Sequence, residues 1–144
     1  MPLPRPEPGL VISYAYLWRH EKRRGQEDGV KDRPCAIAVA VQQNETDILV
    51  RVCAITHRPP ENPDHAVEIP PKVKDHLGLD HERSWIIIDE INTFIWPGPD
   101  LRPIPGDPAK FDYGLLPPAL FQQIIQKMQV LRTHNVLKNI ARTE

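Results

Sequence analysis

Apolar residues in the first part of the chain come in short runs separated by polar segments, a pattern typical of β-strands. Residues 10–18 are rich in β-branched and aromatic side chains, residues 34–41 are continuously apolar, and residues 48–56 alternate between two faces. We predict a strand over each of these ranges. The polar residues 43–46 predict a tight turn between the last two strands, and residues 19–31 predict a charged loop between the first two.

A short helical turn is predicted near the middle of the chain. Residues 58–65 include three prolines and indicate a loop, and the apolar residues 66–69 indicate a short strand. The helical turn covers residues 72–77. Pro71 lies in its first turn and Gly78 closes it, as these residue types commonly do at helix ends.

The remaining strand signals lie just before a proline-rich segment. Residues 84–89 and 91–96 predict two strands, or one strand with a bulge at Glu90. Residues 97–112 include five prolines without periodicity, so we expect a long covering loop there.

The last segment is predicted to be a helix that begins at Pro117 and Pro118, because apolar residues recur there at helical spacing. Its apolar face consists of Leu120, Phe121, Ile124, Ile125, Met128 and Leu131. Residues 136–140 contain enough apolar positions to continue the helix.

These elements predict a mostly β, α+β fold. Five or six short strands, one helical turn and a C-terminal helix describe a small barrel with the helix packed on its side. Residues 1–8 alternate proline with other residues and predict an extended arm. Residues 9–144 then form a single domain, long enough to bury one core.

Charge and composition narrow the function. The chain has 18 Lys and Arg against 19 Asp and Glu, so any nucleic-acid site must be a local patch. No apolar run approaches the roughly 20 residues that a membrane span needs, and the N-terminus lacks the apolar region of a signal peptide. We expect a soluble, cytoplasmic protein with no membrane partner.

Metal and cofactor sites are not expected. The six histidines are scattered without zinc spacing, and no phosphate-binding glycine loop or nucleophile elbow is present. Cys35 and Cys53 lie inside apolar runs, so we expect buried free thiols. A disulfide between neighbouring strands is the alternative.

Arg33 is the first candidate for chemistry, since it stands at the entrance of the most apolar strand. A guanidinium there can project over the rim of the fold and grip a phosphate with two hydrogen bonds. The alternative is an exposed ion pair with Asp32 or Glu27.

The second candidate is the run Thr56, His57 and Arg58 at the exit of the third strand. Metal-independent RNA cleavage needs a base, a cation at the phosphate and a proton donor, and this run supplies candidates for all three. Ordinary loop chemistry is the alternative. The third candidate is Asp89, which with Glu90 follows a buried strand and either acts as a base or faces water at a turn.

In this order, these features resemble the MazF/PemK toxins of toxin–antitoxin modules. The matching parts are a glycine and an aromatic strand at residues 9–18, an Arg-Pro entrance to an apolar strand at residues 31–37, and Ile55-Thr56 at a strand end. Residues 89–96 follow the family spacing Asp-Gln-x-x-Ser/Thr-x-x-Trp, and a C-terminal helix closes the fold. The resemblance covers roughly residues 9–131.

The resemblance implies an SH3-like barrel that forms homodimers and binds RNA in a groove at the dimer interface. It also implies a growth-inhibiting endoribonuclease that leaves a 2′,3′-cyclic phosphate and a 5′-hydroxyl without a cofactor. Arg33 would stabilise the phosphorane, Thr56 would hydrogen-bond the scissile phosphate, and His57 would replace the family's serine and transfer the proton. The chain departs from the family at Ile87 and Asn92, where some members have basic residues.

The partners follow from local charge. Arg58 and a basic excess between positions 19 and 31 predict the RNA-binding surface, and an acidic antitoxin protein would compete with RNA there. The basic residues of that segment are Arg19, Lys22, Arg23, Arg24 and Lys31. Two alternatives stay open: a CcdB-like gyrase inhibitor, and a non-catalytic barrel that binds protein or nucleic acid.

Overall fold

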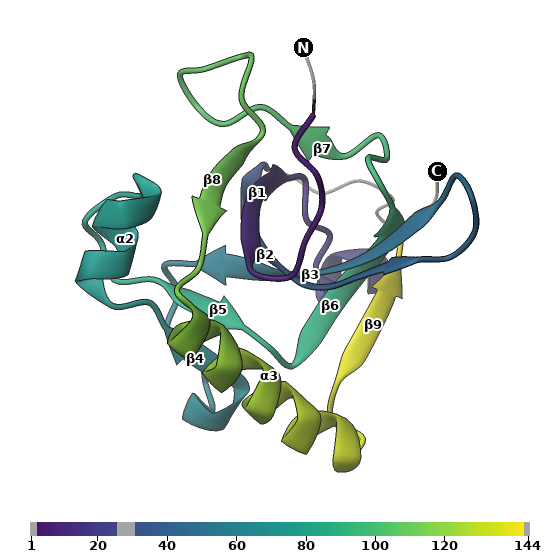
Figure 1. Ribbon diagram of the computed structural model, residues 1–144. Helices are drawn as coiled ribbons and strands as arrows, with labels where there is room; N and C mark the ends of the chain where they lie inside the picture. The colour runs from purple at the N-terminus through teal and green to yellow at the C-terminus, as the bar shows by residue number, and fades with distance from the viewer. Residues whose placement is uncertain (1–2, 26–30, 143–144) are drawn as a thin grey trace.

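Nine strands pair into one sheet in the computed structural model, which describes residues 3–25 and 31–142 (Figure 1). The fold is mostly β, of the α+β class. The strands are β1 (Leu10–Tyr14), β2 (Arg33–Gln42), β3 (Ile48–Thr56), β4 (Ala66–Glu68), β5 (Trp85–Ile87), β6 (Glu90–Ile95), β7 (Leu101–Arg102), β8 (Asp112–Leu115) and β9 (Lys138–Ala141). The helices are α1 (Arg19–Arg23), the 3-10 turn η1 (Pro63–His65), α2 (Pro71–Leu77) and α3 (Pro118–Thr133).

The long strand β3 organises the sheet. It pairs with β2 along most of its length, while its first half pairs with β6 and its end pairs with β5. The strand path runs β4-β5-β3-β2-β1-β7, and β8 joins β1. All pairs are antiparallel except β6 with β9. Within the described residues this path does not close into a ring, since β4 and β7 remain its two ends.

The central strands are buried on both faces, as the continuous apolar run of β2 predicts. Cys35 and Ile37 of β2 belong to one hydrophobic cluster, and Ala36 and Ala38 belong to a second cluster on the opposite face. Helix α3 covers the second cluster (Figure 1) with Leu120, Ile124, Met128 and Leu131. Both cysteines are buried free thiols, which confirms that prediction. Burial raises the pKa of the Cys53 thiol to about 12, so the thiol is unreactive near neutral pH.

The sequence patterns predicted the ends of several strands and helices correctly. The ends of β3 match the prediction, and α2 ends at Gly78, whose φ of 70° is the left-handed conformation that glycine accepts without strain. The region after Ser84 forms two strands, β5 and β6, instead of one bulged strand. Strand β1 ends at Tyr14, four residues earlier than predicted.

Two predicted loops and the predicted extension of the C-terminal helix were wrong. Residues 19–23 of the predicted charged loop form α1, where the Glu21 carboxylate accepts a hydrogen bond from the Trp18 amide and so satisfies the helix start. Residues 26–30 of that loop lie outside the described residues. The predicted loop 97–112 contributes β7 and the start of β8, because both pair with β1. The segment after α3 turns back as β9 instead of continuing the helix.

The predicted apolar face of α3 is covered within the chain. Its large apolar side chains pack into the core of the same chain. Among the described residues, the large hydrophobic side chains that are exposed lie apart in the sequence: Leu3, Val41, Leu115 and Val130. Trp96 is half-buried. No helix in the described part of the chain is both long and apolar enough to cross a membrane.

Asn92 ties the segment after β1 to the sheet. Its side-chain oxygen accepts a hydrogen bond from the Leu17 amide at 2.9 Å, and its side-chain nitrogen donates to the Leu17 carbonyl at 2.8 Å. The guanidinium of Arg142 donates to the same Asn92 oxygen and to the Ala15 carbonyl, and it forms an ion pair with Asp100 at 2.9 Å. The residues of this cluster are all buried, so the cluster fixes where Trp18 enters α1: Ala15, Leu17, Asn92, Asp100 and Arg142.

Replacing Asn92 with leucine should destabilise the fold by about 3 kcal/mol, because it leaves the buried Leu17 amide and carbonyl without partners. Urea denaturation measures the change in the free energy of unfolding. The neighbouring variant Thr93→Val is the control, since it loses only an exposed hydrogen bond to Asn139. Equal stabilities for the two variants would contradict the role given to Asn92.

Candidate functional site

A cleft of about 690 Å³ opens where β2 begins and β3 ends. Its walls come from four parts of the chain: the entry to α1, the β2–β3 strand ends, the loop before η1, and the β5–β6 junction. The lining residues are Trp18, His20, Glu21, Arg33, Thr56, Arg58, Pro59, Pro60, Glu61, Asn62, His65, Ile87, Asp89 and Glu90. The cleft therefore gathers Arg33, Thr56 and Asp89 of the predicted catalytic set.

Arg33 and Thr56 meet through strand register. Strand β2 pairs Cys35 with Ala54 of β3. Continuing this antiparallel register by two residues places Arg33 opposite Thr56. The guanidinium carbon of Arg33 lies 5.2 Å from the centre of the Trp18 ring. The Nε atom of Arg33 is buried and has no hydrogen-bond partner among the described residues. Arg33 thus contacts an aromatic ring, and no carboxylate among the described residues pairs with it, which leaves its charge available to an anion.

A histidine–aspartate pair stands in the same cleft. Nδ1 of His65 lies 3.2 Å from a carboxylate oxygen of Asp89, and both side chains are partly buried. Pairing of β4 with β5 makes this contact, since the Ile88 amide donates to the His65 carbonyl at 3.0 Å. A carboxylate on Nδ1 fixes that nitrogen as the donor and leaves Nε2 as the acceptor. The sequence interpretation missed His65; pairing the two predicted strands 66–69 and 84–89 would have indicated it.

Glu90 has a structural role at the cleft wall. One oxygen of its carboxylate accepts hydrogen bonds from the Tyr16 hydroxyl at 3.0 Å and from the Arg19 amide at 3.1 Å. Burial raises the pKa of the Glu90 carboxyl, and burial together with the nearby Glu90 raises the pKa of the Tyr16 hydroxyl. Glu90 thus holds the start of α1 against the sheet.

His57 is not among the residues that line this cleft, and it shares a neighbouring hollow with Arg33, Thr56 and Arg58. It lines a second hollow of about 380 Å³, whose shared wall with the cleft consists of Arg33, Thr56 and Arg58. Its Nε2 lies 2.8 Å from Asp80 and its Nδ1 lies 3.5 Å from Glu82. Both ring nitrogens thus face carboxylates, which leaves neither one free to accept a proton from a substrate in the cleft.

His57, Asp80 and Glu82 also form the one group of metal-ligand residues within the described ranges. All three are exposed, and Asp80 already accepts a hydrogen bond from the buried Lys74 ammonium at 2.6 Å. The Lys74 ammonium also donates to the Glu82 carbonyl and to the Ser84 hydroxyl. Asp80, Glu82 and Ser84 therefore provide the hydrogen-bond acceptors of the buried Lys74 ammonium.

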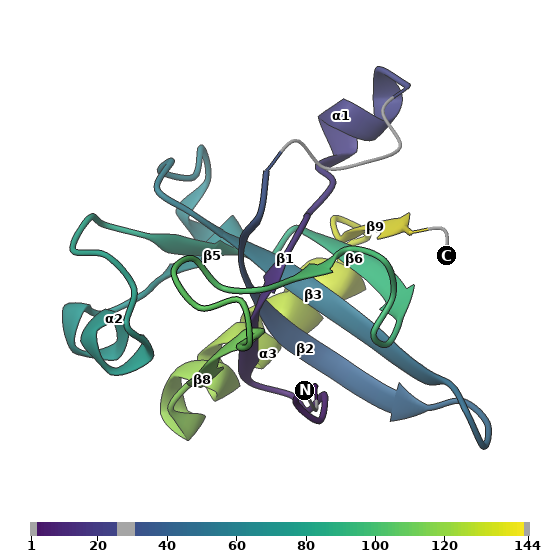
Figure 2. The same cartoon turned by 90° about the horizontal axis from the view of Figure 1, so that it is seen from above.

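The predicted RNA-binding residues fall on different surfaces. Arg58 is exposed and lines both hollows, and Lys31 lines the second one. The other four are exposed on or just after α1, beside the cleft: Arg19, Lys22, Arg23 and Arg24. In Figure 2, α1 projects from the sheet at the side opposite the N-terminus.

Comparisons with known proteins leave the family open. No family model matches the chain, and no curated protein matches it.

The Lys74 cluster generates a prediction about stability. The hydrogen bond from Lys74 holds the pKa of the Asp80 carboxyl below its usual value. The stability that this pair gives the fold is therefore complete at pH values above the usual pKa of an aspartate, and it is lost as the pH falls through the lowered pKa. Asp80→Asn should lower the free energy of unfolding at pH 7 by about 1–2 kcal/mol, since Asp80 is half-exposed and solvent screens the pair.

Chemical denaturation at several pH values tests this prediction. The gap between Asp80→Asn and the wild type should narrow below about pH 4. Asp75→Asn, an exposed carboxylate on α2 that pairs loosely with His81, is the matched control and should change little at any pH. A gap that stays constant down to acid pH would contradict the assignment.

Proposed function

We propose that this chain is a metal-independent endoribonuclease that cleaves single-stranded RNA, as the resemblance to the MazF/PemK toxins implies. One observation supports the proposal most: the arginine Arg33, the strand-end hydroxyl of Thr56 and the His65–Asp89 pair converge in one cleft. These are the groups that RNA transesterification needs, and they come from separate parts of the chain.

Arg33 and Thr56 act on the phosphate. Attack of the 2′-oxygen on phosphorus produces a phosphorane with added negative charge, and the Arg33 guanidinium offers two parallel N–H donors to it. The hydroxyl of Thr56 already accepts a hydrogen bond from the Arg58 amide at 3.2 Å, so its proton is free to point to a phosphate oxygen. Arg58 adds a second positive charge at the mouth of the cleft.

His65 takes the proton-transfer role that was predicted for His57. Its Nε2 removes the proton from the 2′-hydroxyl, while Asp89 orients the ring and stabilises the charge that forms. Proton transfer from the protonated histidine or from water to the departing 5′-oxygen completes the step. The products are a 2′,3′-cyclic phosphate and a 5′-hydroxyl.

The acidic residues of the cleft do not oppose this function strongly. Glu21 accepts a hydrogen bond from the Trp18 amide, Glu90 from Tyr16 and Arg19, and Asp89 pairs with His65. Three of the four cleft carboxylates are therefore engaged by the protein itself, which lowers their effect on an approaching phosphate.

The family assignment extends the proposal to architecture and partners. We infer that the sheet is a variant of the SH3-like barrel, that the chain forms a homodimer, and that an acidic antitoxin competes with RNA at the basic residues of α1. The homodimer rests on the resemblance, because the apolar face of α3 is covered within the chain. Growth inhibition would follow from cleavage of messenger RNA in the cytoplasm.

Arg33→Ala should lower the rate of RNA cleavage by about 10²–10³-fold, which is the usual effect of removing one charge contact to a transition state. The assay is cleavage of a long single-stranded RNA in EDTA, with the cyclic-phosphate ends identified by mass spectrometry. Arg51→Ala is the matched control, since Arg51 is also a half-buried strand arginine with a buried Nε that lacks a partner in the described residues. Wild-type protein that leaves the RNA intact, or an Arg33→Ala variant that cleaves at the wild-type rate, would refute the proposal.

A further inference from the structure

We propose that Trp18 and His20 form a nucleobase-stacking subsite on the wall of the cleft, occupied by an unpaired base next to the phosphate that Arg33 binds. This inference rests on the proposed function for the identity of the chain that enters the cleft. It goes beyond that function by naming the part of the ligand that the α1 entry recognises.

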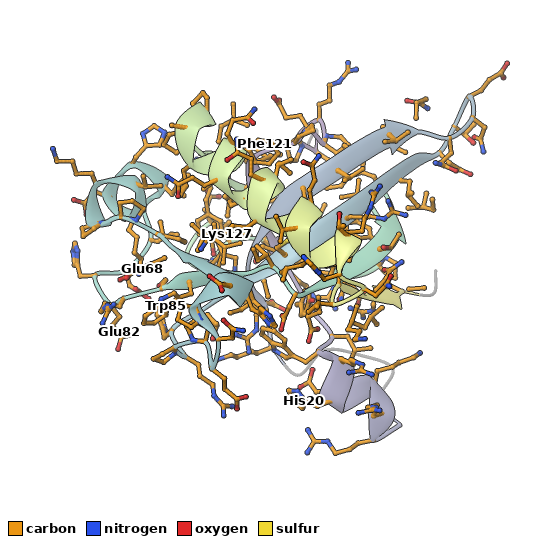
Figure 3. The ribbon with its side chains drawn as sticks, turned by 90° about the horizontal axis from the view of Figure 1, so that it is seen from below. His20, Glu68, Glu82, Trp85, Phe121 and Lys127 are labelled. Carbon is orange, nitrogen blue, oxygen red and sulfur yellow. The ribbon has the colours of Figure 1, made fainter. Side chains whose placement is uncertain are left out.

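The two rings present nearly parallel flat faces. Their planes differ by 15° and their centres lie 6.4 Å apart, and both residues line the cleft. Trp18 is half-buried and His20 is exposed, so aromatic surface faces the solvent-filled space. Figure 3 shows His20 on α1, on the side of the molecule away from Phe121 of α3.

Part of the Trp18 surface remains in the cleft. Tyr16 and Leu17, which are 1% exposed each, fill the core side of this segment, and Trp18 packs against the core while staying half-buried. Trp18 also meets Tyr16 edge-on at 4.9 Å and has the Arg33 guanidinium over its ring at 5.2 Å. A half-buried indole that is held by these neighbours and still lines the cleft offers aromatic surface for stacking.

The surroundings hold the Trp18 backbone rigidly. The Trp18 amide donates to the Glu21 carboxylate at 3.0 Å, and the adjacent Leu17 is held at both its amide and its carbonyl by Asn92. A preformed platform binds a base without the cost of ordering the side chain first. Most surface tryptophans lack such fixation.

The position beside Arg33 favours a nucleobase over other flat ligands. The Arg33 guanidinium contacts the Trp18 ring, so a phosphate held by Arg33 brings its attached nucleotide within reach of the same ring. Stacking on aromatic side chains next to a cationic backbone contact is the general mode by which proteins hold single-stranded nucleic acid. Base-paired RNA cannot use such a platform, because its bases are already stacked.

The test measures binding without cleavage. The probe is a fluorescently labelled six-nucleotide 2′-O-methyl RNA of random sequence, compared with the same backbone in which every nucleotide is abasic. Fluorescence anisotropy gives Kd for both. We expect Trp18→Leu and His20→Ala each to weaken binding of the base-bearing probe by roughly 5-fold or more, and His20→Ala to leave binding of the abasic probe unchanged.

Two further variants separate stacking from folding. Trp18→Phe keeps a ring and should retain most of the affinity, which a purely structural role for the indole bulk would not explain. Trp85→Phe is the matched control, because Trp85 also carries an arginine over its ring, Arg83 at 5.0 Å, but lies outside the cleft. His20 is exposed, so His20→Ala tests the subsite even if Trp18→Leu disturbs α1.

Equal binding of the base-bearing and abasic probes by the wild type would overturn the subsite, and so would unchanged affinity in both Trp18→Leu and His20→Ala. Absence of binding to either probe would overturn it as well. Because the probes lack a free 2′-hydroxyl, the result does not depend on catalysis. A protein that binds as expected but leaves RNA intact would keep the subsite and refute the endoribonuclease.

Discussion

The hydrogen bonds between Asn92 and Leu17 hold together two parts of the chain that sequence separates by 75 positions. Leu17 follows β1, and Asn92 lies in β6, so the bonds fasten the exit of the first strand to a sheet that forms much later in the chain. Arg142, which follows β9, closes the same cluster by reaching Asn92, Ala15 and Asp100. This cluster, together with the hydrogen bonds of Glu90 to Tyr16 and Arg19, sets the position of Trp18 and α1 relative to Arg33.

The cleft depends on that positioning because its groups come from non-local pairs. Arg33 and Thr56 are brought together by the β2–β3 register, and His65 and Asp89 by the pairing of β4 with β5. Trp18 contacts Arg33 and lines the same cleft as His65 and Asp89. The arrangement places the Arg33 cation, the Thr56 hydroxyl and the His65 imidazole around a cleft of about 690 Å³. The charged groups that would bind RNA are gathered at this site, as expected for a chain whose total charge is close to zero.

Sequence patterns predicted the elements whose signals are local. Strands β2 and β3 follow from apolar runs and the polar turn between them, and α2 follows from Pro71 and Gly78. Strand β9 was missed because its parallel pairing with β6 is decided by tertiary contact and leaves no period in the sequence. Short paired segments such as β7 were missed for the same reason, since prolines beside them suggested a loop.

The candidate site was predicted in part for similar reasons. Arg33, Thr56 and Asp89 share the cleft, as strand-end positions indicated. His57 does not, because it follows Thr56 at a strand end where successive side chains point to opposite sides, and it turns to Asp80 and Glu82. His65 has no local motif at all. Only the pairing of two short strands brings it to Asp89.

We propose that His65, held by Asp89, transfers the proton in RNA cleavage. The rate at which His65→Ala cleaves RNA with and without added imidazole tests this role directly. We expect a large loss of rate that imidazole partly restores in proportion to its concentration, while His57→Ala cleaves near the wild-type rate. Cleavage by His65→Ala at the wild-type rate, or loss of activity in His57→Ala alone, would contradict it.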